Sequence, residues 1–358
     1  MEHAEFSFVP LLIVIGIAFL VPIVLSRLRR IFVPIIVGEI LAGILVGQSG
    51  LDLVEKNVVL EILSTLGFIY LMFLSGLEIN FSGLLQARTG ESESRWHRVV
   101  SSHLFLAVAS FLLAVLLSLV AATFMAGFEL VESPWIMALV LSTTSLGVVV
   151  PVLKQEGFTA DHYGQLMMAC SLVADFASIF LISVYVLFHN EGLSAEVLLI
   201  LVLLAMFTIV YRVATLFQKH LPASRFFEEI SSATSQIKLR GSLALALFFI
   251  VLAQTVGSEN ILGAFLAGVI VSMLARDEGS ALREKLDAIG YGFFIPIFFV
   301  MVGVNFNLPA LLDSRSALLL VPVLVVIAYL VKILPALLFR VAYTWRESLA
   351  AGSLLSAR

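Results

Sequence analysis

The sequence predicts an all-α membrane protein, from its composition, its apolar segments and the distribution of its basic residues. Of the 358 residues, 61% are hydrophobic and 13% are charged, which is about half the charged share of soluble domains. The apolar residues form segments of roughly 20, the length with which a helix crosses about 30 Å of hydrocarbon. These segments exclude a transmembrane β-barrel, whose strands alternate apolar and polar residues.

Eleven complete spans and the beginning of a twelfth follow from these segments. The first span has its basic residues after the apolar segment, so we expect an uncleaved helix and not a signal peptide. The predicted spans are 7–26, 32–48, 58–80, 99–126, 134–153, 164–188, 195–217, 237–256, 259–275, 287–305 and 316–342, with the twelfth beginning near Arg346.

The basic residues orient these spans. With the N-terminus outside, sixteen Lys and Arg fall in inside loops or at inside helix ends, whereas Lys56 and Arg315 fall outside. Basic residues concentrate on the cytoplasmic side of membrane proteins. We therefore expect a multi-pass protein of the cell inner (plasma) membrane with its N-terminus outside.

Two pairs of spans share a sequence pattern. The second span contains GEILAGILVG, beginning at Gly38, and the ninth contains GAFLAGVIVS, beginning at Gly263, an offset of 225 residues. Gly76 of the third span aligns with Gly303 of the tenth at an offset of 227. The members of each pair are seven spans apart in the order of the chain. Because seven is an odd number, they cross the membrane in opposite directions. This predicts an inverted repeat, an architecture of many secondary transporters.

The repeat predicts the organisation of the chain. Residues 1–190 are expected to form the first six-helix repeat, residues 191–236 a linker helix and a cytoplasmic loop, and residues 237–358 a second repeat truncated before a thirteenth helix. Residues 1–358 would then be a single transmembrane transport domain, cut from a longer protein.

Two ionisable residues lie in the middle of predicted spans, where a charge is costly and indicates function. Asp175 lies in the sixth span and Lys332 in the eleventh. Burial disfavours an ionised carboxylate and a bound cation favours it, so a cation and a proton would compete for Asp175. The structural alternative is an ion pair between Asp175 and Lys332. A pair that opens when a cation binds would satisfy both interpretations.

The fifth span predicts a broken helix. Its four consecutive hydroxyl residues precede Gly147 and Pro151, two residue types that weaken helices. Freed carbonyls and hydroxyls would offer alkali cations hard oxygen ligands, and a kinked but continuous helix is the alternative. The hydroxyl residues are Ser142, Thr143, Thr144 and Ser145.

Three other residues are weaker candidates. Ser171 precedes Asp175 by one helical turn and would either supply a second oxygen ligand or bond to its own helix. Glu39 and Glu78 lie near helix ends. They would either line the ion pathway or be solvent-exposed residues with a structural role.

Several function classes find no support in the sequence. The single cysteine, Cys170, excludes an internal disulfide and a cysteine-based metal cluster. We recognise no nucleophile–base pair, no phosphate-binding loop, no histidine–carboxylate metal set and no basic surface for nucleic acid. The sequence therefore predicts neither an enzyme nor a nucleic-acid-binding protein.

Taken in order, several segments resemble the cation/proton antiporter superfamily. The resemblance is to its monovalent cation:proton antiporter-2 branch, with the bacterial sodium/proton antiporters and the glutathione-gated potassium efflux systems. It covers nearly the whole chain from about Val33. The matching segments are GEILAGILVG, FLSGLEINF, STTS, Asp175 in its span, LGAFLAGVIVS, FFVMVGVNF, and VKILPALLFR followed by WRESLAAGSLLSAR.

The resemblance implies a sodium/proton-antiporter-like fold of thirteen helices, of which about eleven and a half are present here. Broken helices 5 and 12 would cross beside Asp175, and Lys332 would face it. It also implies a homodimer with dimerisation and core domains, and exchange of Na⁺ or K⁺ for H⁺ by an elevator-like motion of the core. No cofactor is implied, and the only metal would be an alkali cation at Asp175.

One position departs from the family pattern. Relatives carry Asp, Asn or Gln before the aspartate, whereas this chain has Ala174, which leaves Na⁺ versus K⁺ and the stoichiometry open. Potassium efflux relatives also continue into a cytoplasmic regulatory domain, so such a domain or subunit is expected outside this chain. The alternative functions are a sodium-coupled organic-anion symporter of the same fold and a non-transporting membrane sensor.

Overall fold

The computed structural model describes residues 7–27, 33–79, 102–131, 133–189, 208, 212, 236–255, 260–274, 279–313 and 315–357. Within this part of the chain, seven helices are long and apolar enough to cross a membrane, and two apolar helices, Ile35–Val46 and Asn260–Met273, are shorter. The seventh predicted span, 195–217, falls almost entirely outside the described residues. Arg88, Arg95 and Arg98 of the predicted inside loops also lie outside them.

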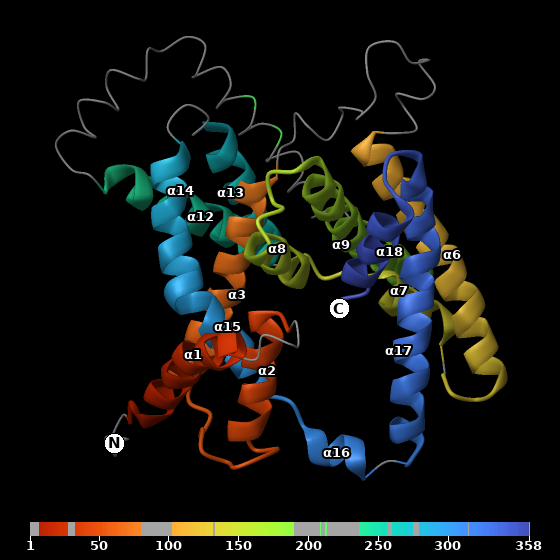
Figure 1. Ribbon diagram of the computed structural model, residues 1–358, viewed down its shortest axis with the longest axis horizontal. Helices are drawn as coiled ribbons and strands as arrows, with labels where there is room; N and C mark the ends of the chain where they lie inside the picture. The colour runs from red at the N-terminus through yellow and green to blue at the C-terminus, as the bar shows by residue number, and fades with distance from the viewer. Residues whose placement is uncertain are drawn as a thin grey trace. The chain divides into compact units, whose positions relative to one another are not determined.

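The described residues form helices joined by turns and short non-helical segments (Figure 1). The helices that precede residue 190 are α1 (Val9–Arg27), α2 (Ile35–Val46), α3 (Val58–Glu78), α6 (His103–Gly127), α7 (Pro134–Ser142), α8 (Leu146–Gln155) and α9 (His162–His189). Those that follow residue 236 are α12 (Ile237–Thr255), α13 (Asn260–Leu274), α14 (Gly279–Ile289), the π-helix η1 (Gly290–Phe294), α15 (Ile295–Val304), α16 (Leu308–Leu312), α17 (Arg315–Ala336), the 3-10 helix η2 (Leu337–Val341) and α18 (Trp345–Leu355).

The tenth span begins earlier than its hydropathy predicts. Helix α14 starts at Gly279 and runs through η1 into α15, whereas the predicted span starts at residue 287. The added turns, residues 279–286, carry Arg283, Glu284 and Lys285. These charges lower the hydropathy of the segment without interrupting its helix.

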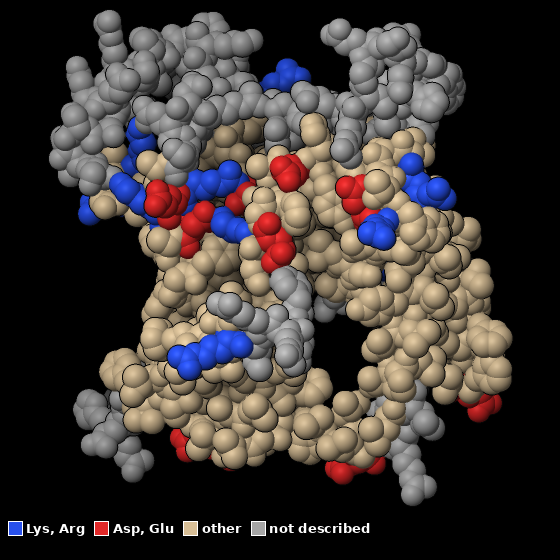
Figure 2. Space-filling view, viewed as in Figure 1, with Lys and Arg blue, Asp and Glu red and all other residues tan. Residues whose placement is uncertain are grey.

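The chain forms two compact units, and each takes helices from both halves of the sequence. Unit 1 comprises residues 1–77, 206–255 and 259–314, and unit 2 comprises residues 78–205, 256–258 and 315–358. In each unit, large apolar side chains face outward, for example Phe19 (68% exposed) on α1 and Phe124 (68% exposed) on α6. A broad part of the visible face carries no charged side chain (Figure 2). Such surfaces suit contact with lipid.

In unit 1, the two pairs of spans that share a sequence pattern make equivalent helix contacts. A Cβ atom added to Gly43 on α2 would fall on the carbonyl oxygen of Val300 on α15. A Cβ atom added to Gly268 on α13 would fall on the carbonyl oxygen of Phe73 on α3. The sequence offsets of 225 and 227 relate Gly43 to Gly268 and Phe73 to Val300. One helix crossing therefore repeats the other.

The same correspondence holds from the other side of each crossing. A Cβ atom on Gly303 would fall on the carbonyl oxygen of Ile40, and a Cβ atom on Gly76 would fall on that of Phe265. Ile40 and Phe265 are again related by the offset of 225. Small residues of this kind allow backbones to approach closely in membrane proteins. They hold unit 1 together at two symmetry-related places.

We predict that Gly43→Ala and Gly268→Ala lower the thermal stability of the purified protein by similar amounts. In both variants the new methyl group meets a backbone carbonyl, which cannot turn away as a side chain can, so the helices must separate. Gly16→Ala in α1 is the control, because a Cβ atom there meets nothing within 4 Å. Melting curves that rank Gly16→Ala with the other two would contradict this account.

Candidate functional site

The fifth span is broken, as the sequence predicts. Helix α7 ends at Ser142 and α8 begins at Leu146, and Thr143 between them is extended, with φ −64° and ψ 163°. We call Thr143–Ser145 the interruption. Pro151 lies inside α8, more than one turn beyond it. The break therefore falls on the hydroxyl residues and not on the proline.

The end of α18 supplies partners for the interruption. The Thr144 hydroxyl donates to the carbonyl of Leu355 at 3.0 Å, and the Ser145 N–H donates to the carbonyl of Ala357 at 3.0 Å. Backbone without helical hydrogen bonds needs such partners when it lies at membrane depth. These bonds bring together the two segments that were expected to cross, helix 5 and helix 12.

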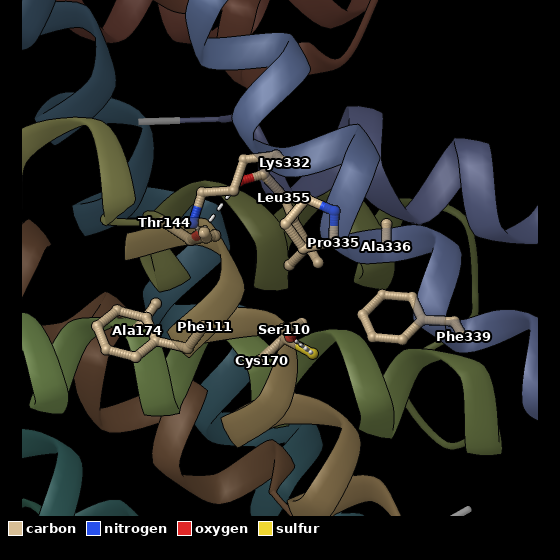
Figure 3. A pocket seen from close by; sticks show the side chains of 11 residues that line it. Ser110, Phe111, Thr144, Cys170, Ala174, Lys332, Pro335, Ala336, Phe339 and Leu355 are labelled. Atoms are coloured by element: carbon tan, nitrogen blue, oxygen red, sulfur yellow. Dashed lines mark hydrogen bonds between the residues drawn. The ribbon is translucent and has the colours of Figure 1, made fainter. Parts of the chain in front are cut away.

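Lys332 lies on α17 and reaches the same place. The side chain is buried, at 6% exposure, and its Nζ donates to the Ser142 carbonyl at 2.5 Å. The same Nζ donates to the Thr144 hydroxyl at 2.7 Å (Figure 3). The carbonyls at the end of a helix carry partial negative charge. The ammonium therefore stabilises the C-terminal end of α7.

Asp175 lies on α9, at the other end of the interruption. Its Oδ2 accepts a hydrogen bond from the N–H of Leu146 at 3.4 Å, where Ser145 forms no side-chain cap. The carboxylate thus lies at the N-terminal end of α8, which carries partial positive charge. Lys332 also acts on Asp175 electrostatically. The two charged groups therefore bind at opposite ends of the interruption, Lys332 at Ser142 and Thr144 and Asp175 at Leu146.

The remaining predicted hydroxyl ligands bond to their own helices. Ser142 Oγ donates to Leu139, Thr143 Oγ1 to Val140 and Ser171 Oγ to Met167, each to a backbone carbonyl. For Ser171 this geometry matches the structural alternative considered from the sequence. Thr144 is the residue of the run whose hydroxyl joins other elements.

Glu78 and Glu39 are not part of the group of residues at the interruption. Glu78 is buried, at 7% exposure, and pairs with Lys154 at 2.8 Å. This burial corrects the expectation that Glu78, if structural, would be exposed to solvent. Lys154 lies about 12 Å from Leu146 along α8, at 1.5 Å per residue. Glu39 is buried in α2, which belongs to unit 1.

Sequence reasoning missed the backbone groups that complete the site. The N–H of Leu146 and the carbonyls of Leu355 and Ala357 belong to apolar residues, whose side chains give no sign of this role. One available signal was the capping box of Thr344 and Glu347 at the start of α18, since such a pair marks a helix N-terminus in the sequence. It marks the start of α18 at Trp345, which agrees with the twelfth span predicted to begin near Arg346.

We predict that Thr144→Val lowers the stability of the protein by about 1–3 kcal/mol, the cost of leaving buried partners unsatisfied. The change keeps the shape of the side chain but removes a donor to Leu355 and an acceptor for Lys332. Thr143→Val is the matched control, because that hydroxyl bonds within its own helix. Equal melting temperatures for the two variants would show that Thr144 does not hold the crossing together.

Known proteins resemble this chain over nearly its whole length. The putative Na⁺/H⁺ antiporter YjbQ of Bacillus subtilis is 38% identical over 360 residues, covering 99% of this chain and 56% of that protein. The probable Na⁺/H⁺ antiporter 3 of Methanocaldococcus jannaschii is 28% identical over 319 residues, covering 88% and 76%. The chain thus spans little more than half the length of the Bacillus relative.

The structure also matches a solved fold. The sodium proton antiporter MjNhaP1 from Methanocaldococcus jannaschii at pH 8 superposes with a TM-score of 0.57 at 16% identity, covering 95% of this chain and 80% of that one. This likeness identifies the all-helical antiporter fold. The model of the transmembrane sodium/hydrogen exchanger family matches residues 15–358. The chain therefore belongs to the sodium/hydrogen exchanger family.

Proposed function

We propose that this chain is the transport core of a secondary antiporter that exchanges Na⁺ or K⁺ for protons by alternating access. The observation that carries the proposal is the interruption of the fifth span. It offers backbone and hydroxyl oxygens at Ser142 and Thr144, with the carboxylate of Asp175 at one end and the ammonium of Lys332 at the other. Family membership and the names of the relatives support the same activity.

In this proposal Asp175 binds either the cation or the proton. Burial favours the neutral carboxyl group, and a cation beside it favours the ionised form. Each ligand therefore displaces the other from one site. This competition couples the two transport steps without a cofactor.

Lys332 in turn occupies oxygens that suit an alkali cation. Its ammonium bonds to the Ser142 carbonyl and the Thr144 hydroxyl, and both are hard oxygen ligands. A cation entering the interruption would displace it. If the displaced lysine then releases its proton, two protons move for each cation and exchange is electrogenic.

For the whole protein we propose a homodimer in the plasma membrane, with the N-terminus outside and a regulatory domain or subunit beyond this chain. The organisation into residues 1–190, a linker at 191–236 and a second repeat at 237–358 belongs to the same proposal. The glycine contacts of unit 1 support the repeat. The comparisons do not favour the organic-anion symporter or the sensor.

We predict that Asp175→Asn abolishes cation-driven proton movement while the protein still folds. The amide keeps the shape of the carboxyl group but neither holds a cation by charge nor exchanges a proton. The test is exchange in proteoliposomes of the full-length protein, with an acid-loaded lumen and Na⁺, K⁺ or Li⁺ added in turn. Asp161→Asn, at an exposed loop position, is the control, and wild-type rates in Asp175→Asn would end the proposal for this residue.

Lys332→Gln should reduce the pH profile of exchange to a single titration and lower the charge moved per cycle. Glutamine still donates to the interruption but has no proton to release. The measurements are the pH dependence and voltage dependence of exchange, together with the melting temperature of the same sample. Lys285→Gln on exposed α14 is the control. An unchanged pH profile with a lower melting temperature would mean that Lys332 serves only to hold the helices together.

A further inference from the structure

A small cavity lies beside Lys332 in unit 2. Its volume is about 20 Å³, which exceeds the 10–15 Å³ that a single water molecule needs. Residues from α6, α9, α17, η2 and α18 line it, together with Thr144. Figure 3 shows Lys332 and Thr144 on one side of this space and the pair Ser110–Cys170 on the other.

The far wall of the cavity offers an acceptor. Ser110 Oγ donates to the Ala107 carbonyl at 3.0 Å and lies 3.8 Å from Cys170 Sγ. A hydroxyl oxygen has two lone pairs and one proton, so Ser110 keeps acceptor capacity while its proton is engaged. The thiol is a weak donor and a weak acceptor. The rest of the lining is mainly apolar.

We infer that this cavity receives the Lys332 ammonium when a cation takes its place at the interruption, and that Ser110 is the positioning residue that accepts it. The inference rests on the proposed function, in which cation and ammonium compete for the oxygens of Ser142 and Thr144. A displaced ammonium needs a new acceptor, because a buried charge without one is costly. The cavity adjoins the present position of Lys332 and has the size of one small polar group.

The move would also help the lysine to lose its proton. At the interruption Lys332 bonds to a helix-terminal carbonyl and a hydroxyl, whereas the cavity offers one hydroxyl and one thiol in largely apolar surroundings. Fewer polar partners favour the neutral amine. Among the described residues, Asp175 and Cys170, both on α9, interact electrostatically with Lys332. Among the cavity-lining residues of α6, η2 and α18, none titrates.

The single cysteine of the sequence gives a direct readout. The infrared S–H band of Cys170 should shift when Na⁺ or K⁺ is added to the full-length protein, because Ser110 changes its partner. Loss of the band in Cys170→Ser assigns it. The shift should disappear in Lys332→Gln. It should persist in Ser118→Ala, because Ser118 is buried in α6, the helix that carries Ser110, but does not line the cavity.

Transport separates this inference from the proposed function. Ser110→Ala should displace the pH profile of exchange, and Ala114→Val, which fills the cavity, should raise the cation KM by about tenfold, a change equivalent to one hydrogen bond to a charged group. Ser118→Ala should leave both unchanged. A fixed S–H band in a preparation that exchanges cations would overturn the cavity inference alone. Absence of exchange with every cation would overturn the proposed function and this inference with it.

Discussion

A helix interrupted at membrane depth leaves backbone groups that need partners, and the site is organised around that need. The helical hydrogen bonding of the fifth span is interrupted at Thr143–Ser145, and three other elements supply partners there. Helix α18 ends against the interruption through Leu355 and Ala357, α17 provides Lys332, and α9 provides Asp175. Because lipid offers no alternative partner, the positions of these elements are coupled.

The same interruption gives each charged residue an electrostatic role. Separate half-helices present a partly negative end at Ser142 and a partly positive end at Leu146. Lys332 lies at the first and Asp175 at the second, so both charges are stabilised in place without requiring a direct ion pair. A carboxylate and an ammonium held by backbone dipoles can each exchange their ligand while the other remains. This arrangement suits a site that alternates between a cation and protons.

The sequence was sufficient for the parts of the structure that depend on residue type. Hydropathy predicted the spans that the structure describes, the glycine pattern predicted the equivalent contacts of Gly43 and Gly268, and the hydroxyl run predicted the break. The sequence did not predict the contacts that are made by backbone groups or that depend on how distant segments are arranged in the fold. The carbonyl of Leu355 accepts a hydrogen bond, yet any residue has such a carbonyl. The early start of α14 was missed because an amphipathic helix has low mean hydropathy.

Two kinds of contact join the helices, and the difference between them bears on the proposed function. In unit 1, Gly43 and Gly268 bring backbones so close that even a methyl group would not fit, so those contacts have one geometry. Unit 2 joins its elements at the site through hydrogen bonds to Thr144 and Lys332, whose partners can be exchanged at small cost. Steric repulsion at close backbone contacts fixes the geometry of a helix crossing. Hydrogen bonds, in contrast, permit alternative partners of similar energy. The proposed ion exchange would require both a rigid set of helix contacts and a site whose hydrogen bonds can change.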